Sequence, residues 1–262
     1  MKAISFKLSG KTACFRKPDV NQFAYFTYNN IHKPVLLGLL GAILGLKGHI
    51  QLSNENRRIE EENKAVKKKA DKKPLNDGFP EFYERLKDLK ISITPLAPHG
   101  YFSKKIQVFN NSVGYASKEM GGNLIVREQW LEEPKWQIII LDDGSSEYEK
   151  LKEYLLNGKS VFVPYLGKND HPARIDEVRE IELRDFIEGV KISSLFIENR
   201  CEIFGGKPRG ELSYLFREVS PMRLQKEYHF YEYENLIFTN HKVVSSEYRD
   251  IYSYDNQNYF FL

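Results

Sequence analysis

Alternating apolar and polar side chains predict a strand near the start of the chain, where Ile4, Phe6 and Leu8 occupy every second position. A period of two places such side chains on one face of an extended segment. The same reasoning predicts further strands at residues 89–96, 136–141 and 161–165. Because residues 136–141 are almost continuously apolar, we expect that strand to lie at the centre of a sheet.

Helical patterns separate these strands. Pro34 suits the first turn of a helix, where no N–H donor is needed, and an apolar run follows at residues 35–46. Residues 79–89 have helical spacing, and Ser145 or Ser146 is a suitable N-cap for a helix after the 136–141 strand. The predicted order is strand, helix, strand, strand, helix, strand. This is the split βαβ arrangement of ferredoxin-like and RNA-recognition-motif domains.

Other segments fall outside this arrangement. Residues 54–73 contain eight Lys/Arg and five Asp/Glu, which predicts an exposed helix or a disordered insertion, with a solvated spacer favoured over an RNA contact. Residues 99–127 combine cations with glycine turns and predict a basic, hairpin-like arm. Residues 170–262 include short aromatic-rich runs and predict a second, β-rich part.

Composition narrows the class of protein. The 262 residues are 41% apolar and 29% charged, which is enough for one large core or two small ones. Two cysteines are too few for a disulfide-stapled secreted domain, and no signal-peptide pattern opens the chain. The longest apolar run is too short to span a bilayer. We therefore expect a soluble, cytoplasmic protein.

Charge adds a candidate chemistry. Residues 1–50 carry seven Lys/Arg and one acid, a net +6, so the remainder carries −3 within the total of +3. Aromatic side chains such as Phe15, Phe23, Tyr25 and Tyr28 are interleaved with these cations. Cations neutralise phosphates and aromatic faces stack on bases, so this pattern favours nucleic-acid binding.

Enzymatic motifs are sparse. The glycines of residues 38–47 match neither a P-loop nor a dinucleotide fingerprint, and the cysteines and histidines lack zinc-ligand spacing. We expect no cofactor and no metal. Metal-independent RNA cleavage needs a base for the 2′-hydroxyl and an acid for the leaving oxygen. The chain offers Tyr28, His32, His99, Lys104 and Lys105 for these roles.

Four sequence blocks in this order resemble one family. They are FKLSGKTACFRKPD (6–19), HKPVLLGLLGAILGLKG (32–48), VREQWLEEPKWQIII (126–140) and VPYLGKNDHPARI (163–175). Together they are similar to the Cas-five family of CRISPR-associated proteins, and most similar to its type I-B form. The similarity covers roughly residues 1–175 and extends only loosely into the C-terminal part.

The resemblance implies an α+β fold of the RAMP superfamily. Residues 1–169 would form a ferredoxin-like, RRM-like domain, with the charged insertion at 54–73 and a protruding β-hairpin thumb at 99–127. Residues 170–262 would form a smaller β-rich domain. The superfamily's glycine-rich loop is matched best by residues 205–210, which a tight turn explains equally well.

The resemblance also implies a function in antiviral defence. The protein would be a non-catalytic crRNA-binding subunit of a type I surveillance complex (Cascade). It would cap the 5′ handle of the crRNA, contact the Cas-seven backbone subunit and the large subunit, and reach target DNA through the complex. No contact with a membrane is expected. The expected RNA-binding residues are Arg16, Lys17, Tyr28, His32, Lys33, Lys104, Lys105, Lys118, Arg127, Lys207 and Arg209.

In this hypothesis Lys and Arg bind phosphates, while Tyr28 and His32 stack on or hydrogen-bond an unpaired base. Two alternatives stay open. One is a metal-independent endoribonuclease that processes CRISPR repeat RNA, as the type I-C form of the family does. The other, which ignores the resemblance, is a two-domain scaffold that binds no nucleic acid.

Overall fold

An antiparallel sheet forms the centre of the computed structural model. Its strand order is β3-β6-β1-β7, and β1 pairs with both β6 and β7. The strands are β1 (Lys2–Ser9), β3 (Ile91–Pro95), β6 (Lys135–Leu141) and β7 (Arg174–Glu182). The structure describes residues 1–19, 23–66, 68–111, 118, 124–204, 210, 212–244 and 249–262.

The apolar run predicted to be central is central. β6 lies between β3 and β1, and Ile138 and Ile140 are fully buried. The strand predicted at 161–165 is wrong, because these residues form no strand and Val163 is 75% exposed. The last strand of the sheet is instead β7, whose many charged residues concealed it.

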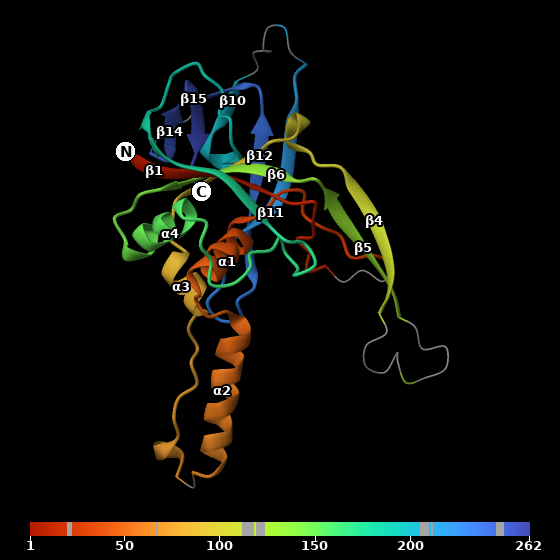
Figure 1. Cartoon of the computed structure of the whole chain (residues 1–262), viewed down its shortest axis with the longest axis vertical. Helices are drawn as coiled ribbons and strands as arrows, with labels where there is room; N and C mark the ends of the chain where they lie inside the picture. Colours follow the sequence, from red (N-terminus) through yellow and green to blue (C-terminus); the bar gives the residue numbers. More distant parts are fainter. Residues whose placement is uncertain are drawn as a thin grey trace.

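Helices cover one face of this sheet (Figure 1). They are α1 (Lys33–Leu44), α3 (Glu81–Leu86) and α4 (Ser146–Leu156). The N-cap of α4 is Ser145, one of the two serines predicted for this position, because its Oγ accepts a hydrogen bond from the Tyr148 N–H at 3.1 Å. At Gly41 a Cβ atom would collide with Phe82 of α3. This glycine therefore allows α1 and α3 to pack closely.

The C-terminal hairpin covers the opposite face, so the molecule has three layers (Figure 1). This hairpin consists of β14 (Ile251–Tyr254) and β15 (Gln257–Phe260), and β8 (Arg184–Asp185) pairs with β14. A second hydrophobic cluster fills this side and includes Ile139, Ile181 and Phe261. Leu262 closes the free edge of β3, because its N–H donates to the Ile91 carbonyl at 2.9 Å.

The rest of the C-terminal part is also β-rich. It contains β9 (Phe196–Ile197), β10 (Glu202–Phe204), β11 (Leu215–Leu224), β12 (Tyr231–Thr239) and β13 (Lys242–Val244). The main hydrophobic core is continuous across both parts, since it includes Leu40 and Ile138 as well as Phe196 and Leu236. A division after residue 169 would separate β7 from its own sheet.

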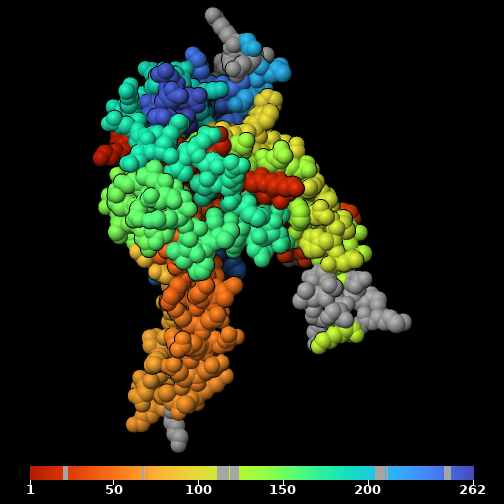
Figure 2. All heavy atoms as spheres, viewed as in Figure 1, coloured from red at the N-terminus to blue at the C-terminus, as the bar shows by residue number. Residues whose placement is uncertain are grey.

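Two structures project from this body (Figures 1 and 2). One is α2 (His49–Lys64), a helix without a buried residue, which overlaps the insertion predicted at 54–73. The other, here called the arm, pairs β4 (Lys104–Asn111) with β5 (Leu124–Glu132). β4 lies within the segment 99–127 predicted as a hairpin, whereas β5 begins there and continues five residues beyond it. Part of the segment predicted as the thumb, between β4 and β5, lies outside the described residues.

Smaller elements complete the chain. The short strand β2 (Thr12–Ala13) pairs with β5 at the base of the arm. Single 3-10 turns occur at Lys69–Asp71, Pro98–Gly100 and Glu198–Arg200. Among the described residues, no single helix is both long and apolar enough to cross a membrane. Together α1 and α2 meet that length and composition only as a pair bent by 77°.

Candidate nucleic-acid interface

Two arginines meet aromatic rings at the base of the arm. The guanidinium carbon of Arg16 lies 3.4 Å from the centroid of the Tyr25 ring. That of Arg127 lies 5.2 Å from the Phe23 centroid. The Tyr25 N–H donates to the Arg127 carbonyl at 2.9 Å, which places the two cation–aromatic pairs side by side. We call these four residues the arm-base surface.

The local sequence explains how this surface forms. After β2 the chain runs out and returns, so Arg16 pairs with Thr27 in an isolated β-bridge. The returning segment then lies beside β5, where the Gln129 N–H donates to the Tyr25 carbonyl at 2.8 Å. An isolated β-bridge between Tyr25 and Glu128 therefore attaches this returning segment to the arm. It joins Arg16 to Arg127, which are far apart in sequence.

The arm-base surface is accessible. Arg16 is exposed, Tyr25 and Arg127 are half-buried, and the Phe23 side chain is 70% exposed. A guanidinium group presents planar N–H donors that match phosphate oxygens, and an exposed aromatic face can stack on a base. This combination fits an unpaired nucleotide, in which the phosphate and the face of the base are both accessible.

Lys17 and Lys104 belong to a second group, at the contact between the N-terminal segment and β11. Their ammonium groups lie 5.2 Å from the Tyr28 ring centroid and 5.4 Å from the Tyr101 ring centroid, respectively. Both lysines interact electrostatically with Glu218 of β11. Burial lowers the pKa of Lys104. Part of the charge of these two lysines therefore compensates a carboxylate of this chain.

Glu218 explains why that compensation is needed. Its carboxylate accepts hydrogen bonds from the Asn29 N–H at 2.7 Å and the Asn30 N–H at 3.2 Å. Burial raises the pKa of the Glu218 carboxyl, whereas the bond from Asn29 and the nearby Lys104 act in the opposite direction. The Glu218 carboxylate therefore joins β11 to the N-terminal segment at Asn29 and Asn30.

Burial contradicts the expected roles of Tyr28 and His32. Their exposed fractions are 3% and 1%, so neither ring is available for stacking on a base. The His32 ring is surrounded by those of Phe15, Tyr28 and Tyr231, with centroid distances of 6.4, 5.2 and 5.2 Å. Burial lowers the pKa of His32 to about 3, so it is neutral at pH 7. Burial also raises the pKa of Tyr28, and a hydrogen bond with Tyr233 adds to this.

The ammonium group of Lys33 is likewise engaged within the chain. Its Nζ donates a hydrogen bond to the Leu262 carbonyl at 2.9 Å. Burial lowers the pKa of Lys33 to about 8, since the site has too little water to solvate the ammonium group fully. The side chain holds the C-terminal end of the chain against the start of α1, and the sequence pattern gave no sign of this.

The remaining expected residues are placed differently. Lys105 is exposed on the opposite face of β4 from Lys104, and its Nζ lies 3.7 Å from a carboxylate oxygen of Glu132. Lys118 is exposed. Lys207 and Arg209 lie outside the described residues. Of the expected RNA-binding residues, the structure thus brings Arg16 and Arg127 together at the arm-base surface. It places Lys17 and Lys104 together beside Glu218.

Sequence reasoning missed a buried ionic network at the base of the arm. Glu128 of β5 is 4% exposed, and the Lys168 Nζ donates to both of its oxygens, at 2.9 and 2.8 Å. The Trp130 indole N–H donates to the same carboxylate at 3.1 Å. Burial raises the pKa of Glu128, but the bonds from Lys168 and Trp130 outweigh it and hold the pKa below its usual value.

This network fixes the loop at 165–172 against the arm. His171 is buried, and its Nδ1 lies 2.7 Å from the Thr12 hydroxyl. Burial lowers the pKa of His171. The loop falls within the fourth sequence block, so the similarity of that block was the available signal. Across the described residues, no group of three or more His, Cys, Asp or Glu side chains is arranged to hold a metal ion.

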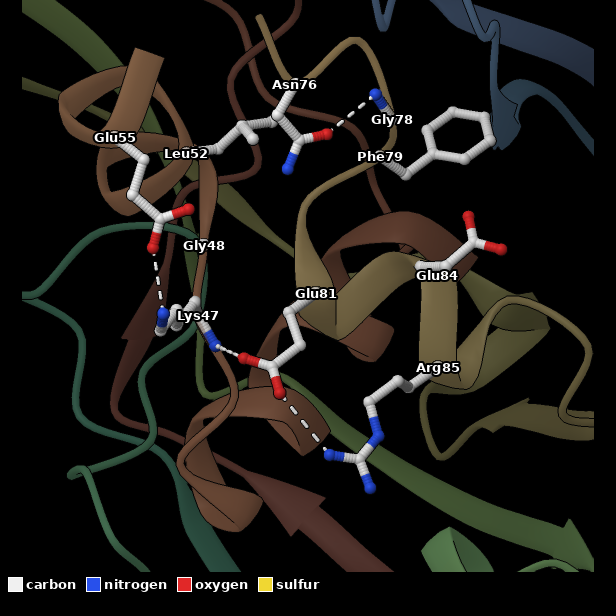
Figure 3. Close-up of a pocket in the computed structure, with 10 residues that line it drawn as sticks. All are labelled: Lys47, Gly48, Leu52, Glu55, Asn76, Gly78, Phe79, Glu81, Glu84 and Arg85. Atoms are coloured by element: carbon white, nitrogen blue, oxygen red, sulfur yellow. Dashed lines mark hydrogen bonds and ion pairs between the residues drawn. The ribbon is translucent and has the colours of Figure 1, made fainter. Parts of the chain in front are cut away.

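Two cavities lie away from the arm. One of about 410 Å³ at the base of α2, with several charged side chains in its lining, is shown in Figure 3. Its charges are already paired, since the Lys47 Nζ donates to Glu55 at 2.8 Å and the Lys47 N–H donates to Glu81 at 3.0 Å. The second, of about 580 Å³, lies against α1 and is largely apolar, with Leu39 and Phe162 in its lining.

Comparisons with known proteins identify the fold. No protein-family model matches the chain, and no curated protein matches it in sequence. A solved structure entitled CRISPR RNA-guided surveillance complex contains a similar chain, with a TM-score of 0.51 and 11% identity over 92% of this chain and 91% of that chain. A CRISPR protein from Archaeoglobus fulgidus has a TM-score of 0.48 and 12% identity, over 99% and 98% of the two chains. The chain thus has the fold of a CRISPR-associated protein.

Proposed function

We propose that this protein is a non-catalytic, crRNA-binding subunit of a type I CRISPR surveillance complex. It would be a Cas-five protein of the type I-B kind that caps the 5′ handle of the crRNA. The observation that carries the proposal is the arm-base surface, in which two guanidinium groups lie beside aromatic rings, one half-buried and one exposed. Such a surface suits single-stranded RNA, whose phosphates and unstacked bases are both accessible.

The architecture supports the proposal. Along the chain the strands of the main sheet occur as β1, β3, β6 and β7, and in space their order is β3-β6-β1-β7. With α1 after β1 and α4 after β6, this order is what the proposal requires of a split βαβ, ferredoxin-like domain. In this proposal the arm between β3 and β6 corresponds to the thumb of that superfamily.

An exposed apolar surface supports membership of a complex. Val161, Phe162 and Val163 are 52%, 55% and 75% exposed and follow one another along the chain. The apolar cavity against α1 adjoins them, since Phe162 also lines it. Contiguous exposed apolar surface of this kind marks a site for a protein partner. The partners proposed are the Cas-seven backbone subunit and the large subunit, in the cytoplasm, with target DNA reached through the complex.

Burial argues against the catalytic alternative in its expected form. Tyr28 and His32 cannot reach RNA from their buried positions, and this leaves His99, Lys104 and Lys105 of the five candidate groups. A general acid or base must lie within hydrogen-bond reach of the proton that it transfers. We therefore propose that the protein binds crRNA and does not cut it.

A binding experiment on the full chain tests the proposal. Fluorescence anisotropy would compare a single-stranded RNA carrying the repeat-derived 5′ handle with an unrelated RNA, for the wild type and the Arg16→Gln/Arg127→Gln variant. Loss of two phosphate contacts lowers the salt slope of binding by about 1.4, at about 0.7 per contact on a single strand. The matched control is Arg179→Gln/Arg184→Gln, which removes two exposed arginines elsewhere, one of them above the Tyr254 ring.

Two further measurements complete this test. Tyr25→Leu should weaken RNA binding about tenfold, since stacking of one base contributes about 1–3 kcal/mol. Incubation of repeat RNA with the protein in EDTA should leave the RNA intact, and a specific cut would establish the endoribonuclease alternative. Equal affinity of the wild type and Arg16→Gln/Arg127→Gln for the handle RNA would refute the arm-base surface as its binding site.

A further inference from the structure

The projection formed by α2 is an ordered structure without a core. Helix α2 has 16 residues, which corresponds to a length of about 24 Å. It carries no buried residue, and the chain returns alongside it toward α3. We call α2 and the returning residues 65, 66 and 68–77 the finger. Figure 2 shows it standing clear of the body of the molecule.

Two asparagines hold the finger together. The side-chain amide of Asn56 donates to the Asn76 carbonyl and accepts from the Asn76 N–H, both at 2.8 Å. Asn63 pairs in the same way with the carbonyl and N–H of Lys73, at 2.8 and 2.9 Å. Asn56 and Asn63 are two helical turns apart and so lie on one face of α2. These paired bonds fix the returning segment along α2, which contains no buried residue.

The end of the finger is strongly basic. Residues 64–73 contain six lysines and one aspartate, whereas residues 55–62 contain four glutamates and two arginines. Lys64, Lys68 and Lys72 are exposed, and within the described part of the chain none of the three forms an ion pair. Lys73 is paired with Glu62 at 2.8 Å. The free positive charge is therefore concentrated at the far end, where the finger meets solvent.

The chemistry of this surface differs from that of the arm-base surface. Residues 50–78 contain no aromatic side chain, so beyond His49 at its base the finger offers no aromatic ring for stacking on an unpaired base. Lysine ammonium groups act as point charges that neutralise phosphates without selecting a sequence. A duplex presents its phosphates outward at high density and keeps its bases stacked inside, so it needs no aromatic contact.

We propose that the lysine-rich end of the finger binds the phosphate backbone of a double-stranded nucleic acid, independently of sequence. This goes beyond the proposed function, which assigns single-stranded crRNA to a different surface. Duplex DNA and duplex RNA share the chemistry that would be recognised, and the experiment separates them. The bonds of Asn56 and Asn63 keep the lysines away from the body, at a distance that lets a duplex approach.

The test measures the affinity of the full chain for duplexes of about 20 base pairs as a function of salt concentration. The variant Lys64→Gln/Lys68→Gln/Lys72→Gln removes three charges and keeps helix propensity nearly unchanged. Its salt slope on a duplex should be lower than that of the wild type by up to about 2.7, at about 0.9 per phosphate contact. The matched control is Lys2→Gln/Lys150→Gln/Lys242→Gln, three exposed lysines outside the finger, which should keep the wild-type slope.

Parallel measurements with duplex DNA and duplex RNA show which of the two binds more tightly, and preference for either one supports the proposal. An unchanged slope for the finger variant, or an equal loss in the control, would overturn it. So would binding of the finger to phosphatidylserine vesicles with no affinity for a duplex.

A second variant separates geometry from charge. Asn56→Ala/Asn63→Ala keeps every lysine but releases the returning segment, and we expect at least threefold weaker duplex binding with unchanged binding of single-stranded RNA. Conversely, the Arg16→Gln/Arg127→Gln variant should lose affinity for single-stranded RNA and keep its affinity for the duplex. Failure of the crRNA proposal and failure of the finger proposal therefore give different results.

Discussion

Replacement of Lys168 by methionine tests whether an ionic contact holds the 165–172 loop on the arm. Its ammonium group supplies two hydrogen bonds to the carboxylate of Glu128, which is almost fully buried. Removal of one partner of a fully buried pair costs about 3–5 kcal/mol, because a charge is left without compensation. Here the Lys168 side chain is 31% exposed, and the Trp130 N–H remains as a donor to Glu128. We therefore expect Lys168→Met to lower the free energy of unfolding by about 2 kcal/mol at pH 7.

Urea unfolding followed by tryptophan fluorescence measures this difference. A cycle of Lys168→Met, Glu128→Met and the double variant should give a coupling energy of about 1–2 kcal/mol. Asp170→Asn is the matched control, since the Asp170 carboxylate lies 3.8 Å from Lys168 but is 61% exposed. It should change stability by less than about 0.5 kcal/mol. Additive effects of the two methionine substitutions would show that Lys168 and Glu128 do not stabilise each other.

The pH dependence supplies an independent check. The folded-state pKa of Glu128 is lower than its unfolded value, so its ionised form contributes stability above the unfolded pKa. That contribution is lost as the pH falls through the folded pKa. The difference in stability between the wild type and Lys168→Met should therefore shrink between pH 5 and the acid limit of folding. A constant difference over that range would refute the assignment of the effect to the Glu128 charge.

Three further predictions concern other parts of the chain. Gly167→Ala should destabilise the fold by more than about 2 kcal/mol in thermal unfolding, since its φ is +88° and a Cβ would enter a facing carbonyl. Gly158 has a φ of +60° but open space around it, so Gly158→Ala should lower the free energy of unfolding by only about 1 kcal/mol. The pKa of Lys33 is about 8 in the folded state and 10.5 in its ordinary environment. Between these two pH values the unfolded state therefore binds more protons than the folded state does. Stability should then rise with pH across that interval in the wild type but not in Lys33→Met, as urea unfolding at several pH values would show. Asn56→Ala/Asn63→Ala should speed amide hydrogen exchange in α2 and leave exchange in the main sheet unchanged, whereas faster exchange throughout would contradict a local role.

Segments with a strong local pattern were predictable. The continuous apolar run of β6 and the Ser145 cap of α4 each carry their signal within a few residues, and both elements form where expected. The charged strand β7 lacked such a signal. It is an edge strand of the main sheet, and charged side chains are what an exposed edge tolerates. Its place depends on pairing with β1, which no local pattern encodes.

The candidate site was predictable only in part, for a similar reason. Arg16 and Arg127 were expected from charge, but the role of residues 23–25 in joining them depends on a β-bridge to β5. His32 looks the same in sequence whether it faces solvent or a cage of aromatic rings. The apolar run at 161–165 was interpreted as a strand because periodicity cannot distinguish a buried strand from an exposed apolar loop.

The position of β1 in the sheet has a consequence for synthesis. The first strand to leave the ribosome pairs with β6 and β7, which begin at residues 135 and 174. At about 5–20 residues per second, its apolar face waits on the order of 10 s for the first of these partners. Folding of the sheet is therefore governed by contacts that are distant in sequence, which makes it slow. A chaperone that covers the apolar face of β1 until β6 has been synthesised should therefore raise the yield of native protein.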